Sequence, residues 1–137
     1  MRAYEKLADE LGIYDKCRFI GWAAGEKKDE AFQNCSIFCL PSKNEGMPMS
    51  VLEAMSYGLA TIATPVGGVP QIINDGVDGF LFPVDDVTAL TEKLDVLMSD
   101  NALKERIGKC GRACIEKSFS LDAYMDQIDT IYEIIRK

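Results

Sequence analysis

Two short apolar runs, residues 36–40 and 59–63, constrain the fold of this chain more than any other feature. Each run carries no charge and includes β-branched or aromatic residues, which is typical of strands buried on both faces of a sheet. A helical stretch introduced by Pro48 lies between the runs, and another introduced by Pro70 follows the second run. Because strands alternate with helices over short loops, the sequence predicts an α/β fold, a Rossmann-like parallel sheet with helices on both faces.

Outside these runs the pattern predicts further strands at residues 17–20 and 80–82, for a total of about four. Helices are expected at residues 28–34, 48–58, 70–74, 86–98, 101–117 and 121–136, and a first helix ends at Gly12. The chain opens on that helix without a strand before it, whereas a doubly wound sheet is built from strand–helix units. We therefore expect residues 1–137 to form a single but partial domain.

The charge balance excludes some classes of partner. The net charge of −7 argues against nucleic acid as a partner and against binding of this chain to an anionic membrane surface. The N-terminus lacks the apolar core of a signal peptide, and no stretch is apolar enough to span a bilayer. A cytoplasmic location is the simplest expectation.

The cysteine pattern gives little support for a metal site. The chain has five cysteines, no histidine and no C-x-x-C pair. Cys110 and Cys114 are spaced to share one side of a helix, so a metal remains conceivable there. Free thiols in a reducing compartment are the simpler interpretation, and we expect no metal or other cofactor.

A stretch from Ser42 to Gly58 carries the chemistry. Glu45 and Glu53 lie on either side of a Gly-Met-Pro step that opens a helix. The start of a helix offers unpaired N–H groups and the positive end of a dipole, which suit a phosphate. Carboxylates accept hydrogen bonds from hydroxyls, such as those of a sugar or ribose. Together these groups indicate a nucleotide-sugar site.

The same residues resemble the donor-site signature of a known family. Glu45-x7-Glu53, followed by Ala-Met-Ser-Tyr-Gly, is similar to the signature of family-four-type retaining GT-B glycosyltransferases, the glycosyl transferases group 1. The resemblance continues through residues 64–70 and 74–80, back to residues 18–21, and forward to the Phe-Ser pair at 119–120. It therefore covers essentially the whole chain.

The resemblance implies roles for particular residues. Glu45 would be the catalytic residue, which hydrogen-bonds the transferred sugar and stabilises charge as its bond to phosphate breaks. Glu53 would bind the ribose of the nucleotide. The other implied donor-binding residues are Ser42, Gly46, Met47, Pro48, Met49 and Ser50, with Gly21 and Trp22 near the base.

The family also implies parts outside this chain. An N-terminal domain would bind the acceptor, a glycan or glycolipid, and could bring the protein to the inner face of the membrane. The family's phosphate-clamping Arg and Lys would lie upstream as well, and Lys43 is an alternative cation within the loop. The isolated chain is then expected to be inactive.

Other interpretations stay open at this stage. A non-catalytic nucleotide-sugar-binding or scaffold module could keep the same fold, although the intact glutamate pair speaks against it. A dehydrogenase is disfavoured, because the dinucleotide glycine fingerprint is missing. An apolar stripe marks the last helix and could be exposed or used in self-association. It consists of Leu121, Tyr124, Ile128, Ile131, Ile134 and Ile135.

Overall fold

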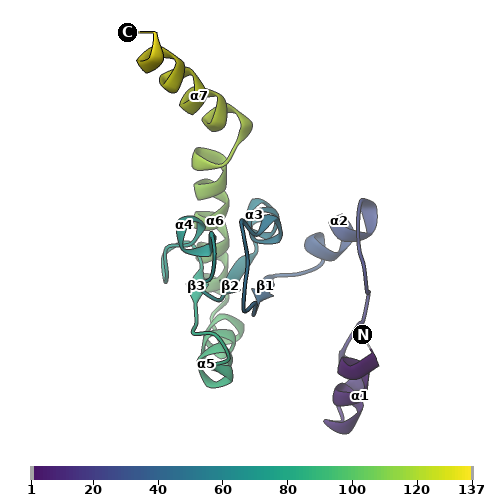
Figure 1. Cartoon of the computed structure of the whole chain (residues 1–137). Helices are drawn as coiled ribbons and strands as arrows, with labels where there is room; N and C mark the ends of the chain where they lie inside the picture. The colour runs from purple at the N-terminus through teal and green to yellow at the C-terminus, as the bar shows by residue number, and fades with distance from the viewer. Residues whose placement is uncertain (1, 137) are drawn as a thin grey trace. The chain divides into compact units, whose positions relative to one another are not determined.

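The computed structural model describes residues 2–136, with only the backbone of Arg2, and divides the chain into two compact units. The first unit extends to Ala31 and the second begins at Phe32 (Figure 1). Each unit is described by itself below.

The first unit consists of helices and irregular backbone. Helix α1 spans Arg2–Glu10, a 3-10 turn η1 spans Tyr14–Lys16, and helix α2, Glu26–Gln33, begins in this unit. The expected strand at residues 17–20 is wrong. A strand needs a neighbouring strand for its backbone hydrogen bonds, and the described part of this unit has none. Instead, the Lys27 ammonium donates to the Ile20 carbonyl at 2.7 Å.

The second unit is built on a parallel sheet, as the sequence predicts. Strands β1 (Ile37–Leu40), β2 (Ala60–Ala63) and β3 (Phe80–Leu81) lie in the order β1-β2-β3, with Ile37 opposite Ala60 and Ile62 opposite Phe80. The described sheet thus has three strands instead of about four. Strand β1 lies at an edge and is only half-buried, where its apolar run predicted full burial.

Helices follow each strand of the second unit. They are α3 (Met49–Ser56), α4 (Val69–Ile72), α5 (Val87–Ser99), α6 (Asn101–Ser118) and α7 (Leu121–Ile135). Side chains cap the last three at their starts. Asp86 accepts from Ala89 N–H at 2.9 Å, Asp100 from Leu103 N–H at 2.9 Å, and the Ser120 hydroxyl from Ala123 N–H at 3.2 Å. These caps satisfy N–H groups that have no partner within the helix, and so fix where the helices begin.

The core lies on both faces of the sheet. Consecutive residues of β2 join different apolar clusters, Ile62 one and Ala63 the other, because side chains of a strand alternate between faces. Helices α3 and α4 cover one face, and α5 covers the other. Helix α6 serves both, with Ile107 in one cluster and Ile115 in the other. The predicted α/β class with helices on both faces is confirmed.

Helix α6 approaches the backbone of its neighbours closely. A Cβ on Gly108 would lie 2.0 Å from the carbonyl oxygen of Gly58, in the turn between α3 and β2. A Cβ on Gly111 would lie 2.9 Å from the carbonyl oxygen of Asp78. Both glycines are buried, so side-chain-free positions are what let α6 pack against these turns.

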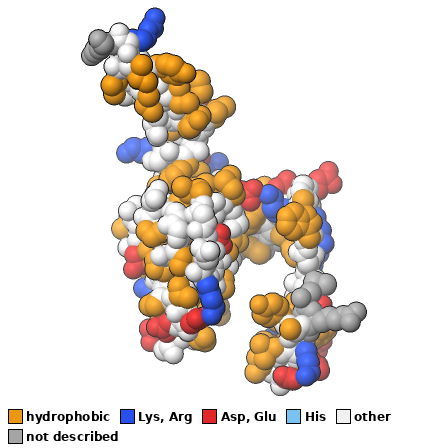
Figure 2. Space-filling view, in the orientation of Figure 1, with side chains coloured by type: hydrophobic (Ala, Val, Ile, Leu, Met, Phe, Trp, Pro, Cys, Tyr) orange, Lys and Arg blue, Asp and Glu red, His pale blue; other side chains and the backbone are white. Residues whose placement is uncertain are grey.

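Helix α7 keeps most of its apolar stripe exposed. Leu121 is 74% exposed and Ile135 is 73% exposed, and Figure 2 shows hydrophobic side chains gathered over this helix. Ile128 is half-buried. The expectation that part of the stripe is exposed is confirmed, and the expected self-association stays a prediction.

The cysteines are not paired in disulfides, and Cys17 and Cys35 are exposed whereas the other three are half-buried. All five are free thiols, and burial raises the pKa of Cys39, which keeps it protonated at neutral pH.

Between residues 2 and 136, no helix has both the length and the apolar character that crossing a bilayer requires.

Candidate functional site

The candidate site lies at the carboxyl edge of the sheet. Because β1, β2 and β3 are parallel, the loops that follow them, residues 41–48, 64–68 and 82–86, leave the sheet at the same edge. This edge is where open α/β sheets bind ligands. The residues that the sequence singles out in the second unit belong mainly to the first of these loops and to the start of α3.

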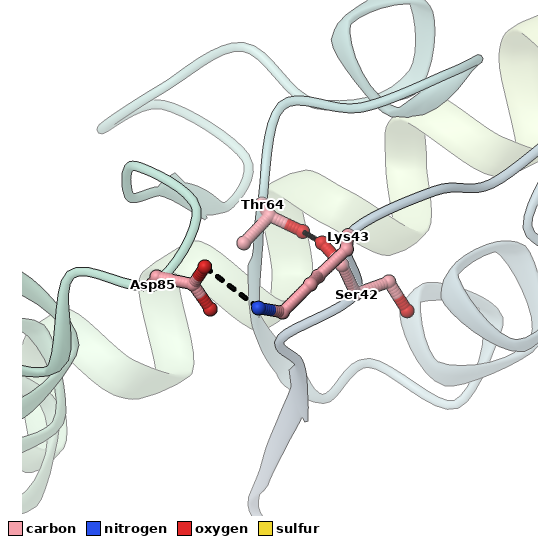
Figure 3. Close-up of polar contacts among 4 residues, drawn as sticks. All are labelled: Ser42, Lys43, Thr64 and Asp85. Carbon is pink, nitrogen blue, oxygen red and sulfur yellow. Dashed lines mark hydrogen bonds and ion pairs between the residues drawn. The ribbon is translucent and has the colours of Figure 1, made fainter.

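Glu45 is held within its own loop. The Ser42 hydroxyl donates to Glu45 Oε1 at 2.6 Å, and both residues are half-buried. The Ser42 carbonyl in turn accepts from the hydroxyl of Thr64, a buried residue directly after β2 (Figure 3). These two hydrogen bonds connect the Glu45 carboxylate to the buried Thr64 and so fix its orientation.

The loop after β2 packs on the backbone of the Glu45 loop. The Gly68 N–H donates to the Gly46 carbonyl at 2.6 Å. Gly67 has φ of +56°, and a Cβ there would lie 2.0 Å from the Glu45 carbonyl oxygen. Only glycine fits this contact, both for its backbone conformation and for the space it occupies. The Gly67-Gly68 pair therefore sets the position of Glu45 and Gly46.

The start of α3 supplies N–H groups to the same region. Pro48 is the N-cap residue, and its carbonyl accepts the first intrahelical hydrogen bond, from Val51 N–H at 3.0 Å. The N–H groups of Met49 and Ser50 precede that bond, at the positive end of the helix. Such a helix start is a ready binding place for an anion.

Glu53 lies one turn further along α3 and is half-buried. All the expected site residues of the second unit lie in one loop and the helix that follows it. They are Ser42, Glu45, Gly46, Met47, Pro48, Met49, Ser50 and Glu53.

Gly21 and Trp22 belong to the first unit. Gly21 has φ of 62°, and Trp22 is 91% exposed. They were expected at the carboxyl end of a strand, but the backbone before them is irregular. Their expected contact with the base stays a prediction.

One contact at the edge involves a residue that sequence reasoning missed. Lys43 Nζ lies 2.7 Å from Oδ2 of Asp85, so the loop after β1 is ion-paired to the loop after β3 (Figure 3). The sequence contains one indication for Asp85. It stands directly before Asp86, and because Asp86 caps α5, the Asp85 carboxylate is left for a different contact. Within residues 2–136, no cluster of three or more His, Cys, Asp or Glu side chains could hold a metal ion.

The sheet and the loop-to-helix turn at its carboxyl edge define a Rossmann-like domain of the GT-B kind. The chain belongs to the glycosyl transferases group 1 family, whose profile matches residues 2–113. A relative, the sulfoquinovosyl transferase SQD2 of Arabidopsis thaliana, is 39% identical over 102 residues, which are 72% of this chain and 20% of that protein. The chain spans 20% of the length of that relative and 33% of the length of another, the N-acetyl-alpha-D-glucosaminyl L-malate synthase of Bacillus anthracis.

Solved structures share the fold. The C-terminal domain of a glycosyl transferase group 1 family protein, LpcC of Francisella tularensis, is 28% identical and superimposes with a TM-score of 0.80 over 88% of this chain and 62% of that one. Alr3699/HepE of Anabaena in complex with UDP is 20% identical, with a TM-score of 0.87 over 96% of this chain and 36% of that one. The second likeness shows the fold alone.

Proposed function

We propose that this chain is the donor-binding C-terminal domain of a retaining GT-B glycosyltransferase. In the reaction, the bond between the sugar C1 and the donor phosphate oxygen breaks, and C1 bonds to an acceptor hydroxyl oxygen. A nucleoside diphosphate leaves, the acceptor hydroxyl loses its proton, and the anomeric configuration is kept. The observation that carries this proposal is the Ser42–Glu45 hydrogen bond of 2.6 Å in the loop that leads into the start of α3.

The donor would lie along that loop. The N–H groups of Gly46, Met47, Met49 and Ser50 face its diphosphate, and the dipole of α3 favours the negative charge. Glu45 hydrogen-bonds the sugar and stabilises the positive charge that develops at C1 as the bond breaks. Glu53 binds the ribose hydroxyls. Gly21 and Trp22 would contact the base.

A nucleotide diphosphate sugar is the donor class that these groups suit. The crystal complex of Alr3699/HepE with UDP, a protein of the same fold, supports this class. The helix start and cations can neutralise the leaving diphosphate, so the proposed reaction needs no metal.

The remainder of the reaction would depend on parts outside this chain. An N-terminal domain would hold the acceptor, a glycan or glycolipid, and further cations would come from upstream. The protein would act in the cytoplasm, at the inner face of the membrane if that domain binds it.

The test is a donor screen on the full-length protein. UDP-glucose, GDP-mannose and ADP-glucose are each incubated with it, and release of the nucleoside diphosphate is measured. Water serves as the acceptor in this assay. We expect release of the nucleoside diphosphate from one donor, and NMR should show that the first-formed free sugar has the donor's anomeric configuration before it mutarotates. Binding of a donor in calorimetry without any release would favour the scaffold alternative, and an inverted first-formed sugar would contradict retention.

A further inference from the structure

The loops at the carboxyl edge are poor in positive charge. Among residues 41–48, 64–68 and 82–86, Lys43 is the single Lys or Arg, whereas Glu45, Asp85 and Asp86 are acidic. The whole chain has a net charge of −7. A diphosphate approaching this edge therefore meets mainly carboxylates, and Lys43 is the one side chain of these loops that attracts it.

Lys43 is held in place by a partner that can be exchanged. Its Nζ lies 2.7 Å from Asp85 Oδ2, and the two side chains are 72% and 67% exposed. The pair spans the end of the central strand β2, because β1 and β3 lie on either side of it. An ion pair this exposed contributes little to stability, so replacing Asp85 by another anion costs the protein little.

The backbone conformation at position 85 does not explain why an aspartate stands there. Asp85 has φ of 62° and is the one non-glycine residue with positive φ in the described chain. Glycine would adopt this conformation without strain, and Asp only tolerates it. Asp86, not Asp85, caps α5. The ion pair with Lys43 is therefore the contact that explains an aspartate at this position.

We propose that Lys43 is a diphosphate-binding residue of the donor site, and that Asp85 is its resting partner, which the donor's diphosphate displaces. The idea rests on the proposed function. A lysine ammonium is a compact charge with three donors, well suited to phosphate oxygens. Asp85 weakens donor binding in two ways, because it occupies the ammonium and because it repels the diphosphate.

The proposal predicts that substitutions of Lys43 and of Asp85 change the KM for the donor in opposite directions. Lys43→Met should raise the KM for the donor about fivefold, because a charge-assisted contact is lost from an exposed site. Asp85→Asn should lower that KM about twofold. Both changes break the same ion pair, so a purely structural pair would give effects of the same sign. The KM values are measured in the full-length protein with whichever of UDP-glucose, GDP-mannose and ADP-glucose the wild type turns over.

Matched variants separate charge from other effects. Asp85→Gly removes the charge and relaxes the backbone, and should match Asp85→Asn; Lys43→Arg keeps the charge and should restore the wild-type KM. Lys109→Met and Glu105→Gln break a comparably exposed ion pair on α6, at 3.3 Å, and should leave KM unchanged. Raised KM in both Lys43→Met and Asp85→Asn, or no change in either, would overturn the inference. If the wild type turns over no donor, the proposed function itself fails.

Discussion

Glu45 is positioned from two sides by residues far apart in the sequence. Ser42 hydrogen-bonds its carboxylate, and Gly67 packs against its carbonyl from the loop after β2. Thr64 connects the two loops through the Ser42 carbonyl. Preorganisation of this kind is what an electrostatic role in a transition state requires, because the carboxylate need not move when charge develops.

The two glutamates should differ in which kinetic constant they affect. Glu45→Gln should lower kcat about 100-fold with a small change in KM, since its partner gains charge only in the transition state. Glu53→Gln should raise the KM for the donor about tenfold with a smaller change in kcat, because ribose contacts exist before the reaction. Steady-state kinetics of the full-length protein measure both.

Glu116→Gln is the control for this pair. Glu116 accepts from Arg112 at 2.8 Å on the exposed side of α6, far from the loops at the carboxyl edge along the chain. Its substitution removes the same charge and should leave both constants unchanged. Wild-type kinetics for both Glu45→Gln and Glu53→Gln would exclude the site assignment.

At the scale of the elements, the packing of α6 depends on a glycine, Gly108, that has no side chain. Gly108→Ala adds a helix-favouring residue, worth about 1 kcal/mol, but its Cβ would lie 2.0 Å from the Gly58 carbonyl oxygen. The clash should outweigh the propensity, and we expect a net loss of about 1–2 kcal/mol in the free energy of unfolding. Urea denaturation measures it. Lys109→Ala, at the exposed neighbouring position, should change stability little. A neutral or stabilising Gly108→Ala would contradict this packing.

Helix α7 should drive self-association of the chain. Its exposed apolar side chains include Leu121, Ile131 and Ile135. Burying such a stripe in a second copy removes apolar surface from water. Ile131→Lys should therefore shift the mass in sedimentation equilibrium toward the monomer, whereas Asp126→Lys, on the acidic side, should not. A wild-type chain that is monomeric at high concentration would contradict self-association.

The helices and the strands of the second unit were predictable because their signals are local. Pro48 starts α3, and apolar runs coincide with β1 and β2. The strand predicted at residues 17–20 is absent from the structure. A short apolar run cannot show whether a partner strand is available to it. The candidate site is visible in the sequence as a motif, and its role stays a prediction. The Lys43–Asp85 ion pair joins residues 42 positions apart, and no local pattern encodes such a contact.

At the scale of the whole molecule, the chain is one side of a proposed two-domain enzyme. It spans 20% and 33% of the length of the two curated relatives named above. Transfer requires donor and acceptor to be held together, and positioning of this kind supplies much of the rate. The function of Glu45 would then depend on a partner domain that brings the acceptor hydroxyl to the sugar.

The isolated 137-residue chain should therefore bind donors weakly and make no product. The start of α3 contributes about 1–2 kcal/mol toward an anion, well below the roughly 4 kcal/mol of a millimolar site. Lys43 adds an exposed cation against a net charge of −7. Calorimetry with UDP-glucose, GDP-mannose and ADP-glucose should give little or no heat of binding. Micromolar affinity for any of them would mean that the parts outside the chain matter less than proposed.

The central claim is that the loop from Ser42 to Ser50 holds a nucleotide sugar. A crystal structure of the full-length protein, soaked with the nucleoside diphosphate of the donor that it turns over, tests this most directly. We predict phosphate oxygens at about 3 Å from the N–H groups of Met49 and Ser50, with the ribose hydroxyls on Glu53. A diphosphate bound away from the start of α3, or a ribose that does not contact Glu53, would contradict the account.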